Sequence, residues 1–172
     1  MAKPGKNEYP AYYQTYIDAL DDQGNVLSQM ETSLRFFEKE LSELALDKQE
    51  FSYAEGKWTI KEIIQHLIDT ERVFVYRALR YSRKDKSTLL SYDENVFVAN
   101  YEINKRNYDN LVNEFMLLRR STILMFQNFD EEYLDREGKV GEDIFSVRAL
   151  GYICSGHVLH HLKVIRERYL LT

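Results

Sequence analysis

Three of the four histidines in this chain lie close together near its C-terminal end. His157 and His161 are four residues apart, so on a helix they occupy one face, one turn apart, where two imidazoles can bind a single metal ion. The stretch that contains them, residues 146–169, has the apolar spacing of one amphipathic helix. The remaining histidine, His66, lies far upstream in another predicted helix. We expect the fold to bring His66 to this pair, which predicts a three-histidine metal site with an open coordination position, as in catalytic metal sites.

The residues near these histidines leave several alternatives open. A single histidine on an apolar face is usually a hydrogen-bonded core residue, and histidine pairs at this spacing also occur by chance. His160 should point partly away from the site, as an outer, core or interface residue. Cys154 could be a soft ligand, although a small buried hydrophobic residue is the favoured interpretation. Asp69, three residues after His66, either orients an imidazole from outside the ligand set or is a solvated acid on a helix.

The predicted helix around His66 also carries several basic residues. Arg72, Arg77 and Arg80 could bind an anionic substrate, but a solvated helical face is the favoured interpretation. The sequence contains no GxxxxGK[ST], GxGxxG, GxSxG or HExxH motif, so nucleotide-binding loops, nucleophile elbows and zincin-type proteases are not indicated.

Apolar residues at spacings of three and four predict four long helices, at 26–44, 59–81, 103–126 and 146–169. Thr59 and Glu62 form a capping-box pattern, and Ser146 is placed to cap the last helix. Shorter helical segments are expected at 12–20, after Asp93 and at 130–134. Residues 1–10 are an expected irregular lead-in, and 137–143, which contains two glycines, is an expected loop. Residues 1–172 are therefore expected to form a single all-α domain, a four-helix bundle.

Composition limits the classes of partner. The net charge of -5 argues against nucleic-acid binding. No run of about 18 apolar residues is present, so no membrane span is expected, and residues 1–13 have no apolar core of a signal peptide. A single cysteine allows no disulfide within the chain, which fits a cytoplasmic location.

Two stretches together resemble the DinB-like (DinB/YfiT-like) family of metal-binding four-helix bundles: GKWTIKEIIQHLIDTERVFVYRALR and SVRALGYICSGHVLHHLKVIRERY. The resemblance extends from the first long helix to the C-terminus. It implies an up-down-down-up bundle with long connections, often a homodimer, in which His66, His157 and His161 bind a divalent metal, usually nickel or zinc. Some members of the family transfer low-molecular-weight thiols to electrophiles, and others are regarded as metal-dependent hydrolases.

Two functions follow as expectations. The first is a metal-dependent enzyme, a hydrolase or a thiol S-transferase, that activates water or a low-molecular-weight thiol toward a small-molecule substrate such as an electrophile. The alternative is a non-catalytic metal-binding or dimerising bundle protein linked to stress. A nucleic-acid binder is disfavoured by the charge.

Overall fold

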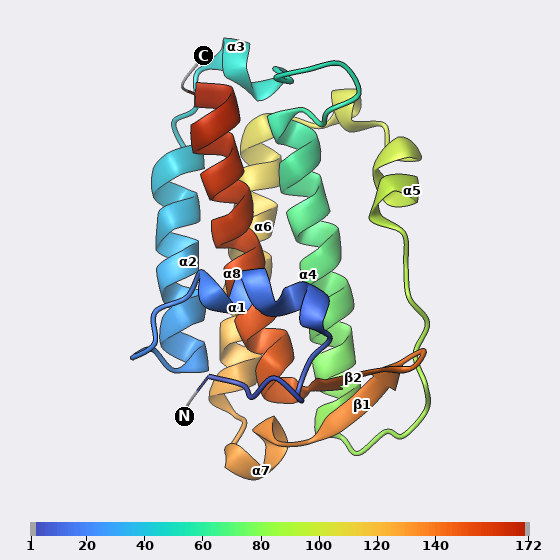
Figure 1. Cartoon of the computed structure of the whole chain (residues 1–172). Helices are drawn as coiled ribbons and strands as arrows, with labels where there is room; N and C mark the ends of the chain where they lie inside the picture. The colour runs from blue at the N-terminus through green and yellow to red at the C-terminus, as the bar shows by residue number, and fades with distance from the viewer. Residues whose placement is uncertain (1–2, 171–172) are drawn as a thin grey trace.

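The computed structural model describes residues 3–170 and contains four long helices. These are α2 (Val26–Leu41), α4 (Ile60–Ser82), α6 (Tyr108–Gln127) and α8 (Val147–Ile165). In Figure 1, α2 and α8 run in one direction and α4 and α6 in the other. The predicted all-α, up-down-down-up four-helix bundle is confirmed.

Shorter elements connect and cover these helices. They are a 3-10 turn (Ala11–Tyr13), α1 (Gln14–Asp18), α3 (Leu46–Gln49), α5 (Glu94–Ala99), a second 3-10 turn (Ile103–Lys105), α7 (Glu131–Leu134), strands β1 (Glu137–Val140) and β2 (Asp143–Ser146), and a π-helical turn (Arg166–Leu170) that extends α8. Of the predicted irregular lead-in, residues 3–10 contain no helix or strand, and residues 1–2 lie outside the described part. Within residues 3–170, no helix is long and apolar enough to cross a membrane.

Local capping signals fix the starts of the two histidine-bearing helices. At the start of α4, the Thr59 hydroxyl accepts a hydrogen bond from the Glu62 amide (3.2 Å), and the Glu62 carboxylate accepts one from the Thr59 amide (2.7 Å). At the start of α8, the Ser146 hydroxyl accepts from the Ala149 amide (2.9 Å). Both predicted caps are confirmed, so the positions of the histidines along their helices are set by nearby sequence.

The segment predicted as a loop at 137–143 is instead part of a β-hairpin, and this corrects the sequence-based expectation. β1 pairs antiparallel with β2, and Gly141 takes the positive φ (58°) that the connecting turn requires. Contacts from distant residues hold the hairpin in place: the Tyr81 hydroxyl donates to the Lys139 carbonyl (2.9 Å), and Leu89 pairs with Val140. The strands are too short to show a pattern of their own.

A buried ion pair joins the four long helices. The Arg119 guanidinium on α6 donates to both carboxylate oxygens of Glu71 on α4 (2.6–2.9 Å). It also donates to the Ser33 hydroxyl on α2 (2.7 Å) and the Cys154 carbonyl on α8 (3.0 Å), while the Thr122 hydroxyl donates to Glu71 (2.9 Å). Because each charge is paired and hydrogen-bonded on several sides, the network can fix the register of the helices despite its burial.

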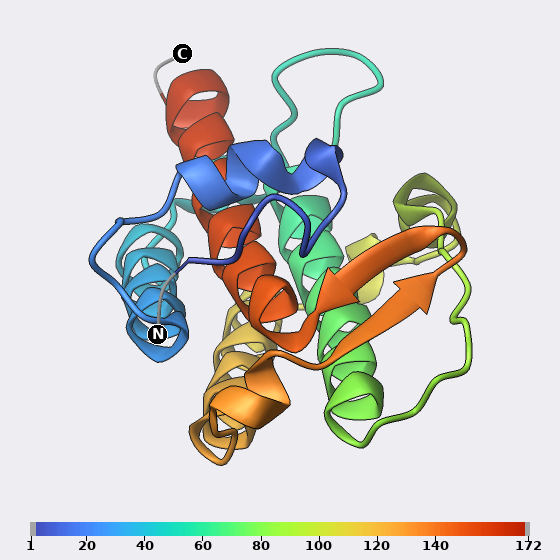
Figure 2. The ribbon, with the colours of Figure 1, turned by 60° about the horizontal axis from the view of Figure 1, so that its bottom comes forward.

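Helix α1 crosses α8, as Figures 1 and 2 both show. Gly156 makes this crossing possible, because a Cβ at that position would lie 2.1 Å from the carbonyl oxygen of Tyr16. The close approach brings the Tyr16 ring next to His157 and His160, at centroid distances of 5.4 and 5.3 Å.

Candidate metal centre

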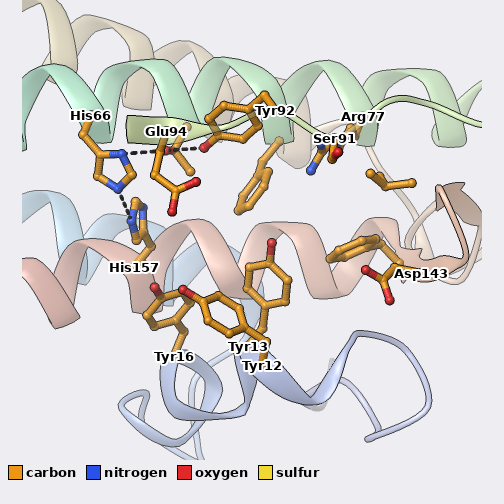
Figure 3. A pocket seen from close by; sticks show the side chains of 14 residues that line it. Tyr12, Tyr13, Tyr16, His66, Arg77, Ser91, Tyr92, Glu94, Asp143 and His157 are labelled. Atoms are coloured by element: carbon orange, nitrogen blue, oxygen red, sulfur yellow. Dashed lines mark hydrogen bonds between the residues drawn. The ribbon is translucent and has the colours of Figure 1, made fainter. Parts of the chain in front are cut away.

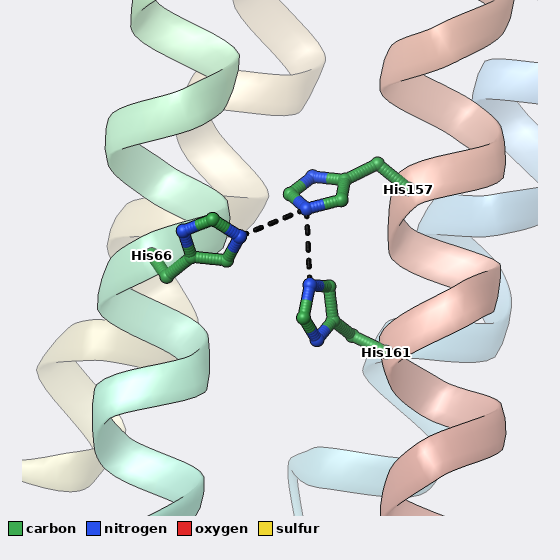
Figure 4. Close-up of side chains that lie close together, drawn as sticks. All are labelled: His66, His157 and His161. Carbon is green, nitrogen blue, oxygen red and sulfur yellow. Dashed lines mark hydrogen bonds between the residues drawn. The ribbon is translucent and has the colours of Figure 1, made fainter. Parts of the chain in front are cut away.

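Three imidazoles converge between α4 and α8 (Figure 4). The Nε2 atom of His157 lies 2.9 Å from Nε2 of His66 and 3.0 Å from Nε2 of His161. Among the described residues, these three form the one group of histidine, cysteine and acidic side chains whose ligand atoms are gathered tightly enough to hold a metal ion. The structure therefore brings together the three side chains that the sequence singled out.

Burial keeps these imidazoles neutral. His66 and His157 are buried and His161 is half-buried. Desolvation lowers the pKa of His66 from 6.5 to about 4, and it lowers the pKa of His157 and His161 well below the ordinary value, with the neighbouring histidines adding to the effect. Neutral rings carry the lone pair that a metal requires.

The arrangement suits a cation better than a proton. A neutral imidazole nitrogen either donates or accepts, so Nε2 of His157 cannot form a good hydrogen bond with both neighbours at once. One cation can accept all three lone pairs. Zinc–nitrogen bonds of about 2.0–2.1 Å at tetrahedral angles would place the ligand nitrogens about 3.3 Å apart, close to the 2.9 and 3.0 Å that separate Nε2 of His157 from its two neighbours. The three residues thus fit a divalent metal.

The surroundings of His66 identify the side chain that orients it. Its Nδ1 atom faces the Thr70 hydroxyl at 3.4 Å, and that hydroxyl lies 2.6 Å from the Tyr92 hydroxyl. Asp69, which the sequence offered for this role, instead accepts a hydrogen bond from Gln65 (2.9 Å). Thr70 follows His66 by one helical turn, so the spacing of the two residues in the sequence could have indicated their contact. Tyr92 belongs to a distant segment, so its contact with Thr70 could not have been found in this way.

Two other candidates take no part in the cluster. His160 is exposed and packs against Tyr16, in line with the expectation that it points partly away. Cys154 is buried, and burial raises the pKa of its thiol. It contributes its carbonyl to Arg119, so the structure agrees with a small buried residue rather than a ligand.

A cavity of about 150 Å³ opens beside His66 and His157 (Figure 3). Aromatic rings from α1, α4, the hairpin and their flanking segments line one part of it: Tyr12, Tyr13, Tyr16, Phe74, Tyr92 and Phe145. Its polar lining includes Thr70, Arg77, Ser91, Glu94 and Asp143. Of the residues that line this cavity, only His66 and His157 were predicted as site residues, and Arg77 was offered as a possible binder of an anionic substrate. The short segments that supply most of the others have no periodic signal.

A second cavity, of about 260 Å³, borders the cluster at His161. Tyr53, Lys57, Trp58, His160 and His161 are among its lining residues. The Trp58 ring also packs on His66, with centroids 4.9 Å apart. Each of the three histidines therefore lines one of the two cavities, so a small molecule can approach them.

The chain matches one family model in sequence and solved structures of known proteins in fold. The family model described as the DinB superfamily matches residues 29–165. YfiT from Bacillus subtilis, described as a probable metal-dependent hydrolase with an unusual four-helix bundle topology, matches in structure with a TM-score of 0.74 and 14% identity, covering 96% of this chain and 90% of YfiT. A mycothiol-dependent maleylpyruvate isomerase matches with a TM-score of 0.67 and 15% identity. That match covers 80% of this chain but 58% of the isomerase. No curated protein matches in sequence.

Proposed function

This chain belongs to the DinB superfamily, and from that premise we propose that it is a metal-dependent enzyme acting on a small molecule. The reaction is either hydrolysis or transfer of a low-molecular-weight thiol to an electrophile. The observation that carries the proposal is the convergence of three neutral Nε2 atoms beside a cavity. By analogy of fold, YfiT supports metal-dependent hydrolysis, and the mycothiol-dependent isomerase supports the use of a low-molecular-weight thiol.

His66, His157 and His161 would hold the metal, with zinc or nickel as its proposed identity. A divalent cation in this position supplies Lewis acidity, which lowers the pKa of a coordinated water or thiol. Thr70 holds the orientation of His66 through Nδ1, so that Nε2 keeps its lone pair directed at the site.

Other side chains control protons and water around the cluster. Glu94 lines the cavity beside the histidines (Figure 3), where its carboxylate can accept the proton that water or a thiol loses. Burial raises the pKa of Tyr92 to about 12, so its hydroxyl stays protonated and can donate a hydrogen bond. The rings of Tyr16 and Trp58 pack on His157 and His66 and limit the access of bulk water.

Metal binding is the first test. Chain purified without a histidine tag, stripped with a chelator and reloaded should bind one equivalent of zinc or nickel. His157→Ala should lose stoichiometric binding, while His160→Ala, the matched control on the same helix, should keep it. Stoichiometric metal in His157→Ala would contradict the proposed ligand set.

Activity is the second test. The loaded protein is assayed with activated esters for hydrolysis, and with an aromatic electrophile plus several cellular thiols for transfer. Turnover that requires both metal and His157 supports an enzyme, and the substrate pair identifies the reaction. Stoichiometric metal without turnover in either assay would favour the non-catalytic alternative. Proposals that accompany this function are a homodimer, a cytoplasmic location, a single domain and no nucleic-acid partner.

A further inference from the structure

Arg77 on α4 is a buried cation without an acidic partner. Its side chain is 4% exposed, and its one hydrogen bond among the described residues is from Nη2 to the Leu90 carbonyl (3.2 Å). The other two arginines singled out on this helix are paired, Arg72 with Glu114 and Arg80 with Asp85. No carboxylate of residues 3–170 lies within ion-pair distance of Arg77.

This burial corrects the interpretation of Arg77 as part of a solvated face. Its guanidinium lies 5.4 Å from the centroid of the Phe74 ring and 5.9 Å from that of Tyr92. Burial lowers the pKa of Arg77, but a guanidinium keeps its charge in proteins. A desolvated charge without a counter-charge is costly, so an anion that reaches it would be bound strongly.

Arg77 lines the same cavity as the histidines (Figure 3). It follows His66 by eleven positions, which is close to three full helical turns, so the two residues share one face of α4. Eleven residues span about 16 Å along the axis, and the arginine side chain leans toward the N-terminal end of the helix. A ligand that reaches both would therefore be on the order of 10 Å long.

We propose that Arg77 binds a carboxylate of the substrate, and that the reacting end of the substrate lies at the histidines. Placing the reacting end rests on the proposed function; the carboxylate site itself does not. The acids Glu94 and Asp143 line the same cavity, so one arginine suits a single negative charge better than a phosphate dianion. The walls of Tyr13, Phe74 and similar rings suit an apolar, flat body. The substrate class is thus a small apolar monocarboxylate.

Benzoate is a suitable probe, with benzamide as its neutral counterpart and inorganic phosphate as the competing anion. Binding is measured by isothermal titration calorimetry on full-length protein kept metal-free by a chelator, so that the wild type and all variants share one readout. In the wild type, the NMR signal of the Arg77 Nε–H group also shows whether the ligand contacts this arginine. The variants are Arg77→Gln, Arg77→Lys and, as a control, Arg120→Gln at an exposed arginine on α6. Circular dichroism verifies that each variant is folded.

We expect benzoate to bind at least about ten-fold more tightly than benzamide, which has no charge to pair with Arg77, and than phosphate, whose second negative charge is disfavoured by Glu94 and Asp143 in the same cavity. Arg77→Gln should lose this preference, Arg77→Lys should keep part of it, and Arg120→Gln should leave it unchanged. Equal binding of benzoate and benzamide to the wild type would overturn the proposal even if Arg77→Gln failed to fold. Tighter binding of phosphate would overturn the carboxylate class.

The design separates this proposal from the metal chemistry. Benzoate binding that depends on Arg77 in metal-free protein would stand even if the histidines bound no metal. Conversely, stoichiometric metal without any benzoate response would leave the metal site in place and remove the carboxylate site.

Discussion

Mild acid should destabilise the metal-free protein through its buried histidines. The folded-state pKa of His66 is about 4, below the unfolded value of 6.5, so the unfolded chain binds the proton first as the pH falls. The stability contributed by the neutral ring is therefore complete above pH 6.5 and is lost progressively toward pH 4. The pKa values of His157 and His161 are displaced in the same direction, so they add to the loss.

The magnitude follows from the shift of His66. At 1.36 kcal/mol for each pH unit of displacement, the full effect is about 3 kcal/mol, of which about 2 kcal/mol is lost between pH 7 and pH 5. The loss is large against a typical total stability of about 5–15 kcal/mol. Keeping the pH at 5 or above limits the contribution of carboxylates, whose ordinary pKa values lie near 4.

The assay is urea unfolding followed by far-UV circular dichroism, in excess chelator, at several values between pH 5 and pH 7. The free energy of unfolding of the wild type should fall with pH by at least the amount given, while His66→Gln should fall by clearly less. His160→Gln should keep most of the wild-type fall, because the three buried or half-buried histidines remain, although the pKa of the exposed His160 is lowered too. A wild-type stability that is flat over this range, or a full slope in His66→Gln, would refute the reasoning.

Two further variants test the supports of the site. Thr70→Val removes the hydroxyl that faces Nδ1 of His66, and it should weaken metal affinity about 10–100-fold while the stoichiometry is kept. The affinity is measured by competition with a chromophoric chelator. Unchanged affinity would show that the hydroxyl does not orient the ring. Glu71→Gln leaves Arg119 buried without its counter-charge, so the free energy of unfolding measured in urea should fall by about 3–5 kcal/mol. A decrease below about 1 kcal/mol would mean that water reaches the guanidinium.

Much of the bundle could be predicted because its signals are local. The helix predicted at 59–81 is observed at Ile60–Ser82, since the capping box and the apolar stripe both belong to that stretch. The helix predicted from residue 103 begins instead at Tyr108, where the Asn107 side chain accepts a hydrogen bond from the Asn110 amide (3.1 Å). That cap is also a local signal, but the apolar spacing alone does not reveal it.

The hairpin could not be predicted in this way. β1 and β2 have four residues each, too few for an alternating pattern, and what holds β1 is the hydroxyl of Tyr81 and the pairing with Leu89. Both partners come from α4 and the segment that follows it. The stability of such an element resides in its tertiary contacts, which a single stretch of sequence does not display.

The proposed metal ligands could likewise be predicted from local signals, whereas most residues around them could not. His66 and the pair on α8 lie on long helices whose faces can be assigned from periodicity, so their convergence was open to prediction. Arg77 shares the face of His66 by the same 3.6-residue period, yet an arginine on a helix is usually solvated. It is buried here because short segments cover that face, and the rings of Phe74 and Tyr92 enclose its guanidinium. Periodicity therefore indicates where the three histidines converge, whereas most of the cavity beside them is lined by residues of the short segments that close over the helices.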